Sequence, residues 1–445
     1  MSFSSYPEYK DSNVEWLGEI PQHWEVAKIG TLFREVAEVG EDGLPILSVS
    51  IHDGVSDKEL SDDEVERKVT RSEDLSKYKK VCPGDLVYNM MRAWQGGFGT
   101  VSVTGQVSPA YVVARPKAKF QTLFIEHLLR TPCAVEEMRR YSRGVTDFRL
   151  RLYWEEFKVI KLAMPGAAEQ AAICAFLDRE TGNIDVLVAE QEKLIELLKE
   201  KRQAVISHAV TKGLDPNVPM KDSGIEWLGK VPAHWKISRV KHVCSHVVDC
   251  LHTTPTYNGD LEFPAIRTAD LERGVLLLEQ ARLVSREVYE ERIQRLRPIS
   301  GDILYSREGE RFGMAALVPE NVDLCLGQRM MMFRTSDGIH SEYVMWLLNS
   351  SSVYNQVLEK VGGSTSPHIN ITDIINFHIP RPPLKEQQQV ADRIRNVITC
   401  LDNLIAETQR AIGLLNERRS ALISAAVTGK IDVRGLVPLE AEEAA

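Results

Sequence analysis

The stretch Glu169–Thr211, EQAAICAFLDRETGNIDVLVAEQEKLIELLKEKRQAVISHAVT, occurs a second time at Glu386–Thr428 as EQQQVADRIRNVITCLDNLIAETQRAIGLLNERRSALISAAVT. The two copies align without a gap at an offset of 217 residues, and 17 of the 43 aligned positions are identical. Neither copy contains proline, and both are rich in residues that favour helix. The repeat therefore predicts two matched helices, each about 65 Å long at ~1.5 Å per residue.

Apolar side chains recur along one narrow face of each predicted helix. In the first copy this face consists of Ile173, Leu177, Ile184, Leu187, Leu194, Leu198 and Val205, and in the second of Val390, Ile394, Leu401, Leu404, Ala411, Leu415 and Leu422. Such a heptad seam is typical of coiled coils rather than of surface helices in a globular core. Two unrelated surface helices would not share the seam and the constant offset. We therefore expect an antiparallel coiled coil that sets a fixed distance along the chain, as a ruler does. Contacts with the other helix or with partner subunits are expected for Leu187, Leu194, Leu198, Leu404, Leu415 and Leu422.

A shorter motif also occurs twice, ahead of each helix. Residues 10–24 read KDSNVEWLGEIPQHW, and residues 221–235 read KDSGIEWLGKVPAHW, at an offset of 211. The chain is therefore built from two tandem halves, each with an opening motif, a mixed region and a long helix. Duplication at this scale indicates a pseudo-twofold architecture.

The regions between opening motif and helix contain short apolar runs separated by turn residues, as expected for strands. A Gly-Asp turn followed by an apolar run that ends in tyrosine occurs in both halves, at residues 84–88 and 301–305. Amphipathic helices are expected at residues 123–141 and 341–361. Elsewhere the two regions barely match, so the frame repeats while the inserts differ, as expected if each insert recognises something different.

Composition bounds the class of protein. The chain has 445 residues, enough for about three domains, and a formal net charge of −9. A protein that binds nucleic acid by bulk electrostatics alone would be basic, so any DNA binding must depend on local groups or on partners. The seven scattered cysteines suit a reducing compartment. With neither a signal-peptide pattern at the start nor an apolar run of membrane length, we expect a soluble, cytoplasmic protein.

These repeats resemble the specificity subunit of type I restriction-modification enzymes, over nearly the whole chain. The resemblance rests on the WLG-x-[IV]-P-x-HW openings, the Gly-Asp turns, the Glu-Gln helix entrances and the Ala-Val-Thr helix ends. It implies an α+β fold with two mixed α/β target-recognition domains separated by the two long helices. The implied division is residues 1–165 for the first recognition domain with its opening motif, 166–213 for the central helix, 214–381 for the second recognition domain, 382–432 for the distal helix and 433–445 for a disordered tail.

The resemblance also implies a function without catalysis in this chain. Each domain would read one half of a bipartite, asymmetric double-stranded DNA target, while the helices set the spacer and dock two methyltransferase subunits. Restriction-translocase subunits would join where the host has them. S-adenosylmethionine, ATP and Mg would then belong to the partner subunits, and this chain would need no cofactor and no metal.

Base reading requires side chains such as Arg, Lys, Asn or Gln near base edges. Candidates in the first domain follow the Gly-Asp strand, and those in the second lie at the equivalent place and before a later apolar run. They are Asn89, Arg92, Trp94 and Gln95 in the first domain, and Ser306, Arg307, Glu308, Arg311, Gln328 and Arg329 in the second. For each residue taken singly, a solvated loop position is an equally good interpretation.

Two other classes of function compete with DNA reading: an enzyme, which would be a nuclease or a methyltransferase in its own right, and a scaffold. An amino-methyltransferase would show an Asn/Asp-Pro-Pro-aromatic motif, but the one Asp-Pro pair continues as Asn217-Val218. The His and Cys residues between 242 and 252 do not have zinc-site spacing, and the glycine clusters at 96–99 and 362–365 match no nucleotide-binding motif. The remaining alternative is a coiled-coil scaffold that joins two protein-binding domains and never contacts DNA.

Overall fold

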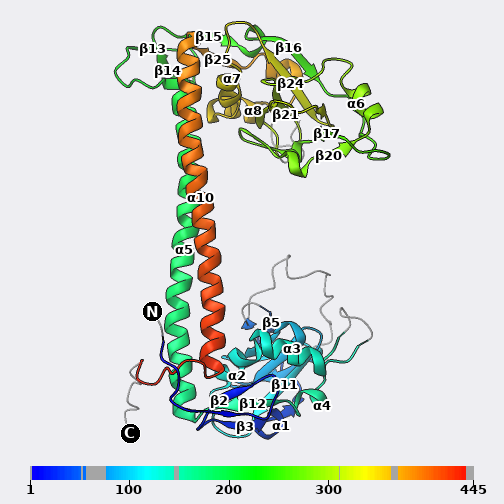
Figure 1. Cartoon of the computed structure of the whole chain (residues 1–445), viewed down its shortest axis with the longest axis vertical. Helices are drawn as coiled ribbons and strands as arrows, with labels where there is room; N and C mark the ends of the chain where they lie inside the picture. The colour runs from blue at the N-terminus through cyan, green and yellow to red at the C-terminus, as the bar shows by residue number, and fades with distance from the viewer. Residues whose placement is uncertain are drawn as a thin grey trace. The chain divides into compact units, whose positions relative to one another are not determined.

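The structure is a computed structural model that describes residues 3–51, 54–56, 77–144, 150–309, 311–361 and 369–436. The chain divides into two compact units: unit 1 is Met1–Gln191 with Arg410–Ala445, and unit 2 is Glu192–Gln409. The boundaries fall inside the two long helices, so each unit contains part of both (Figure 1). The five-part domain division expected from the sequence stays a prediction. No helix among the described residues is long and apolar enough to span a bilayer.

Unit 1 is built around the antiparallel sheet β4-β11-β8-β9. Its strands and short helices are β1 (Tyr9–Asp11), β2 (Glu19–Pro21), β3 (Glu25–Lys28), α1 (Ile29–Leu32), β4 (Phe33–Val36), β5 (Ser48–Ser50), β6 (Gly54–Ser56), β7 (Lys79–Val81), β8 (Leu86–Asn89), β9 (Phe98–Thr100), β10 (Gly105–Val107), β11 (Tyr111–Pro116), α2 (Thr122–Leu129), α3 (Pro132–Tyr141), α4 (Trp154–Phe157) and β12 (Lys161–Met164). The largest core cluster joins this sheet to α2 and to the long helices.

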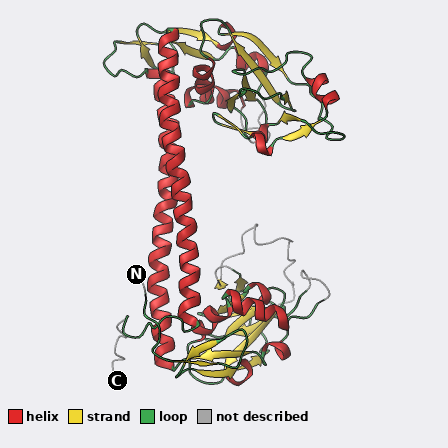
Figure 2. Cartoon of the chain, in the orientation of Figure 1, coloured by secondary structure: helices red, strands yellow, loops and turns green. Residues whose placement is uncertain are grey.

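Unit 2 repeats the four-stranded sheet in the order β16-β24-β21-β22 and adds the sheet β20-β17-β23. Figure 2 shows the strands of the chain in yellow and the helices in red. Its elements are β13 (Met220–Asp222), β14 (Lys230–Pro232), β15 (Lys236–Arg239), β16 (Cys244–Asp249), β17 (Phe263–Ile266), β18 (Leu271–Glu272), β19 (Val275–Leu276), β20 (Arg282–Val284), α6 (Arg286–Arg292), β21 (Ile303–Ser306), β22 (Ala315–Leu317), β23 (Cys325–Leu326), β24 (Met330–Thr335), α7 (Ser341–Leu348), α8 (Ser351–Val361), α9 (Ile371–Ile375) and β25 (His378–Arg381).

The sequence predicted one helix at 123–141 and one at 341–361, and both predictions are wrong in the same way, because each segment forms two helices. In unit 1, Pro132 begins α3 and the Thr131 hydroxyl caps it by accepting from the Ala134 N–H at 3.4 Å. Proline is well tolerated at this first helical position but cannot continue a helix through it. In unit 2, Asn349 follows α7 and its side chain is buried, donating to the Ala315 carbonyl at 2.8 Å.

The two long helices are α5 (Ala167–Lys212) and α10 (Leu384–Val427), and they pack antiparallel within each unit. In unit 1, Arg419 donates to Asp185 at 2.9 Å, and in unit 2, Arg202 lies 3.3 Å from Asp402. Asp185 and Asp402 are equivalent positions of the repeat, as are Arg202 and Arg419, so the same ion pair forms twice. In both pairs the residue numbers add up to 604, so the register is identical in the two units.

The start of each long helix is fixed by the glutamine of its Glu-Gln pair. The Gln170 amide donates to the Pro165 carbonyl at 2.8 Å, and the Gln387 amide donates to the Pro382 carbonyl at 2.8 Å. Both glutamines are buried. Each therefore satisfies a carbonyl that precedes the helix and ties the entering chain to its first turn.

The end of each long helix lies against the tryptophan of an opening motif. Gly429 follows α10 with φ +73°, and Gly213 follows α5 with φ +78°, the left-handed conformation that ends helices and favours glycine. A Cβ atom at Gly429 would lie 3.3 Å from the Trp24 ring, and one at Gly213 would lie 3.3 Å from the Trp235 ring. The repeated Trp therefore marks where one long helix of each unit stops.

Candidate nucleic-acid interface

All ten candidate DNA-reading residues lie at one edge of the two equivalent sheets. Asn89 and Ser306 are the last residues of β8 and β21, and the other candidates follow these strands or directly precede β24. Because neighbouring strands in these sheets are antiparallel, the end of β8 meets the start of β11, and the end of β21 meets the start of β24. Sequence spacing alone therefore located the same edge in both units.

In unit 1 the segment after β8 forms a tight turn that holds two candidate side chains in place. The Asn89 side-chain carbonyl accepts from the Met91 N–H at 2.9 Å, and the Trp94 indole N–H donates to the Met91 carbonyl at 2.9 Å. The side chains of Arg92 and Gln95 form no hydrogen bond or ion pair with any described residue. Their polar groups are therefore available for a ligand.

In unit 2 the equivalent segment is used for internal contacts instead. Ser306 is completely buried, and its hydroxyl donates to the Arg311 carbonyl. The Arg311 guanidinium donates to the carbonyls of Ala269 at 3.0 Å and Leu271 at 3.1 Å. Both side chains thus stabilise the turn after β21, and neither has its full hydrogen-bonding capacity free.

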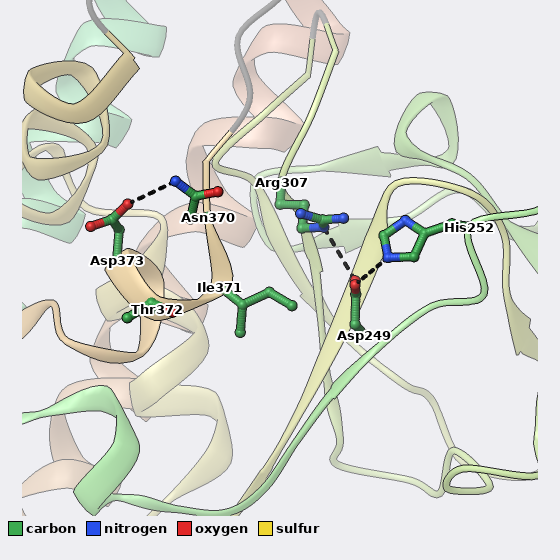
Figure 3. Close-up of a pocket in the computed structure, with 7 residues that line it drawn as sticks. All are labelled: Asp249, His252, Arg307, Asn370, Ile371, Thr372 and Asp373. Carbon is green, nitrogen blue, oxygen red and sulfur yellow. Dashed lines mark hydrogen bonds and ion pairs between the residues drawn. The ribbon is translucent and has the colours of Figure 1, made fainter.

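Arg307 is the most enclosed of the candidate arginines, with a residue exposure of 4%. Its Nε lies 3.2 Å from Asp249 Oδ1, an ion pair without the alignment of a hydrogen bond, and its Nη2 lies 3.1 Å from Glu308 Oε1. Asp249 also lies 2.9 Å from His252 Nε2. Figure 3 shows Arg307 and His252 both directed at this carboxylate.

Asp249, His252 and Arg307 line one side of a polar cavity of about 610 Å³, and residues 370–373 line the other side (Figure 3). The cavity lies at the end of β16, beside the turn that follows β21. Asp249 and Arg307 compensate each other's charge, so the cavity lining does not offer an unpaired buried ion. The exposed member of the cluster is His252, whose side chain is 65% exposed.

Gln328 and Arg329 complete the edge in unit 2. Arg329 has φ +67°, a left-handed backbone that is uncommon for a non-glycine residue and costs about 1–3 kcal/mol. Its carbonyl accepts from the Arg307 N–H at 3.3 Å, and its side chain is 51% exposed, with Nε 3.6 Å from Glu308. The structure therefore brings residues 307–308 and 328–329 together, although they are about twenty positions apart in the sequence.

The expected leucines of the long helices divide into two groups. Leu422 is buried, and Leu198 and Leu415 are half-buried. Leu187, Leu194 and Leu404 are 45%, 40% and 43% exposed. Next to them Ile195 is buried and Val188 and Ile405 are half-buried, so at these three places the buried stripe lies one position after the predicted seam.

Two exposed leucine positions are repeated in both helices. Leu187 and Leu404 differ by the repeat offset of 217, as do Leu197 and Leu414, which are 53% and 65% exposed. Unit 1 contains Leu187 and Leu414, and unit 2 contains Leu197 and Leu404. Each unit therefore presents one leucine from each helix at equivalent places on its helix pair.

The other motifs singled out in the sequence have structural roles or lie outside the described residues. Among the residues that the structure describes, no three His, Cys, Asp or Glu side chains form a possible metal site. Burial raises the pKa of the Cys244 thiol to about 12, so this sulfur stays protonated. Gly99 lies against Val55, with only 2.4 Å from its would-be Cβ to the Val55 nitrogen. The cluster at 362–365 lies outside the described residues.

Known proteins share the sequence pattern of this chain. Residues 232–412 match the model described as the type I restriction modification DNA specificity domain. The chain is 22% identical to the type I restriction enzyme MjaVIII specificity subunit of Methanocaldococcus jannaschii, over 96% of this chain and 98% of that protein. It is also 22% identical to the type I restriction enzyme EcoKI specificity subunit of Escherichia coli K12, over 93% of this chain and 90% of that protein.

Solved structures share the fold. A chain from a study of complex assembly and conformational transition of the type I R-M system aligns with TM-score 0.67 and 15% identity, covering 92% of this chain and 98% of that one. The HsdS subunit from Thermoanaerobacter tengcongensis aligns with TM-score 0.53 and 16% identity, covering 93% of this chain and 98% of that one. The expected mixed fold with two long helices is therefore confirmed.

Proposed function

We propose that the chain is the DNA-specificity subunit of a type I restriction-modification complex, since residues 232–412 match the model of the type I restriction modification DNA specificity domain. Unit 1 and unit 2 each read one half of a bipartite, asymmetric DNA target. The observation that carries this proposal is the recurrence of one sheet edge, after β8 and after β21, with different side chains on an otherwise repeated frame. Different readers on the same frame fit a split target better than a palindrome.

The long helices set the spacer between the two half-sites. This part of the proposal is supported by the identical register in the two units and by the twice-formed ion pairs of Asp185 with Arg419 and of Asp402 with Arg202. The helices act as an antiparallel coiled coil, and the repeat gives the subunit pseudo-twofold symmetry. A ruler of this kind couples helix length directly to the number of base pairs between half-sites.

Two methyltransferase subunits dock on the helices, one at each set of repeated leucines. The support is the equivalence of Leu187 with Leu404 and of Leu197 with Leu414, all at least 43% exposed. Exposed leucines that recur at matched positions favour two copies of one partner. Restriction-translocase subunits join this assembly where the host has them.

The chain itself is a non-catalytic subunit. S-adenosylmethionine, ATP and Mg act in the partner subunits, and the specificity subunit contributes the choice of DNA sequence. The formal charge of −9 fits this division, because partner subunits would provide much of the contact with phosphates. No contact between residues that the structure describes favours the alternative of a protein scaffold.

A methylation map of the host genome, with and without the gene for this chain, tests the proposal. We expect one bipartite methylated sequence that disappears with the gene. A gel-shift assay with a duplex that carries this sequence should show specific binding only when methyltransferase subunits are present. Unchanged genomic methylation together with no DNA binding by the assembled complex would contradict the proposal and favour the scaffold.

A further inference from the structure

The loop that follows β16 in unit 2 is anchored by two arginines through its backbone. Arg292, 8% exposed, donates to the Thr253 carbonyl at 2.6 Å and to the Leu326 carbonyl at 3.1 Å. Arg295 donates to the Asp249 carbonyl at 3.0 Å. Guanidinium groups bind carbonyl oxygens in fixed directions, so this loop is held rigidly although it is at the surface.

A second segment, directly before β24, is fixed against the same loop. The Cys250 N–H donates to the Met330 carbonyl at 3.0 Å, and the Gly327 N–H donates to the Ile266 carbonyl at 2.7 Å. A Cβ atom at Gly327 would lie 2.6 Å from that carbonyl oxygen, so only glycine allows this close approach. Gln328, which follows it, therefore has a defined position at the sheet edge.

One side-chain hydrogen bond joins the two segments. The exposed Thr254 hydroxyl donates to the Gln328 side-chain carbonyl at 3.2 Å, between residues 74 positions apart. The hydrogen bond orients the amide of Gln328 and leaves its NH₂ group without a partner among the described residues. An oriented glutamine amide with a free donor and a remaining acceptor lone pair has the groups that pair with N7 and N6 of adenine in the major groove.

The neighbouring candidates lack this freedom. Arg307 is held by Asp249 and Glu308, Ser306 is buried, and Arg311 binds backbone carbonyls. We propose that Gln328 reads an A·T pair in the half-site of unit 2, with Thr254 as its positioning residue, and that Ser306, Arg307 and Arg311 build the edge without reading bases. This inference rests on the proposed function, because it assigns residues within the same DNA-reading role.

The test uses the full chain assembled with its methyltransferase subunits and duplexes that carry the mapped target. Each base pair of both half-sites is substituted in turn, and binding is measured by gel shift. With Gln328→Ala we expect discrimination at one A·T pair of one half-site to fall by about 5- to 150-fold, with the other half-site unchanged. Gln388→Ala is the matched control, since Gln388 is an exposed glutamine of the same unit on the long helix α10.

Thr254 is tested by a pair of variants. Thr254→Val keeps the shape but removes the hydroxyl, so it should weaken discrimination at the same A·T pair, and Thr254→Ser should restore it. A merely structural role of Thr254 would change binding to all sequences alike. If Gln328→Ala does not fold, Gln328→Glu keeps the volume and removes the donor, and it should lose the same A·T pair.

The outcomes separate this inference from the proposed function. A wild-type complex that reads no bipartite sequence would overturn both. If the wild type reads its target, unchanged discrimination in the Gln328 variants would overturn the inference alone. A uniform loss of affinity for every sequence would also overturn it, because that result indicates a phosphate contact.

Discussion

Glu169 and Glu386, the first residues of the repeated segment, differ in how many groups surround their carboxylates. Glu169 is 9% exposed and accepts from the Tyr6 hydroxyl at 2.6 Å and the Trp24 indole N–H at 3.2 Å, with His23 Nε2 at 2.7 Å. Burial and this carboxylate raise the pKa of Tyr6, so its hydroxyl remains a donor. Within the described part of the chain, Glu386 has one such partner, His234 at 2.8 Å.

We predict that Glu169→Gln destabilises the start of α5 by about 1–3 kcal/mol, because hydrogen bonds to a buried charged acceptor are among the stronger ones. Glu386→Gln should cost less than about 1 kcal/mol, since its one partner is a partly exposed histidine. Hydrogen exchange of peptides from the first turns of α5 and α10 measures both effects. Equal changes in the two variants would contradict the role assigned to Tyr6 and Trp24.

The free side chains after β8 make a prediction at the first half-site. Arg92→Ala and Gln95→Ala should each relax recognition in the half read by unit 1, by about 1–3 kcal/mol if a bidentate base contact is lost. Arg34→Ala serves as the control, because Arg34 is an exposed arginine near the start of β4, at the opposite end of the sheet from the candidate residues. Methylation mapping gives the result, and a change in the same half-site as Gln328→Ala would exclude two separate readers.

At the scale of elements, the paired segments of α5 and α10 keep one register in both units. The ion pair that marks it is largely exposed, with side-chain exposures of 39% for Arg419 and 56% for Asp185. Such a pair contributes little stability, so the register is held mainly by buried apolar residues. These include Ile173 with Leu422 in unit 1 and Ile206 with Ile398 in unit 2.

This register dictates how the ruler must be lengthened. Four residues inserted after Glu192 in α5 and four after Gln409 in α10 lie between the buried contacts of the two units, so both registers survive. Each insertion adds about 6 Å of helix, which equals one or two base pairs at ~3.4 Å each. We predict a methylated target with both half-sites intact and a spacer one or two base pairs longer.

Two variants control the insertion experiment. Insertion in α5 alone should break the register of one unit and abolish methylation. Insertion of two residues in each helix should rotate the apolar face by about 200° at 3.6 residues per turn and also prevent assembly. An unchanged spacer with full methylation in the four-residue variant would show that these helices do not measure distance.

At the scale of the whole molecule, the balance of charge and exposed apolar surface indicates a subunit of a larger assembly. Acidic residues outnumber basic ones, 63 to 54, although the proposed ligand is a polyanion. At the same time several leucines of α5 and α10 are exposed. A partner that covers the leucines and contributes basic groups would explain both the acidic balance and the exposed leucines.

The leucine positions provide the corresponding prediction. The double variant Leu187→Glu with Leu404→Glu should keep its helix content, because glutamate favours helix. Its co-purification with methyltransferase subunits should fall by at least about tenfold, as expected for the loss of two leucines that the partner would bury. Val186→Glu is the control, since Val186 is 60% exposed and its counterpart in α10 is Asn403. Equal loss with the control would mean that the whole helix surface, not the repeated leucines, makes the contact.

The sequence by itself determined the long helices, the repeated sheet strands and the edge where the candidate readers lie. These features depend on local signals: an uninterrupted stretch of helix-favouring residues, apolar runs bounded by turns, and a repeat that makes each half a check on the other. Because these signals are local, the predicted mixture of helices and strands with two long helices agrees with the structure. The segments 123–141 and 341–361 were each predicted as one helix, but each forms two. Thr131 starts a helix and Asn349 ends one through side-chain contacts that periodicity does not reveal.

Only the tertiary structure decided which polar side chains are free. Arg92 and Arg307 both lie within a few residues after a Gly-Asp strand, yet Arg307 is enclosed by Asp249, 58 positions earlier in the chain. Gln328 is oriented by Thr254, 74 positions earlier. A side chain's availability depends on what the fold brings next to it, and contacts between distant segments leave no periodic signal in the sequence. For the same reason the exposed leucines could be located only once the buried stripe of each helix pair was known.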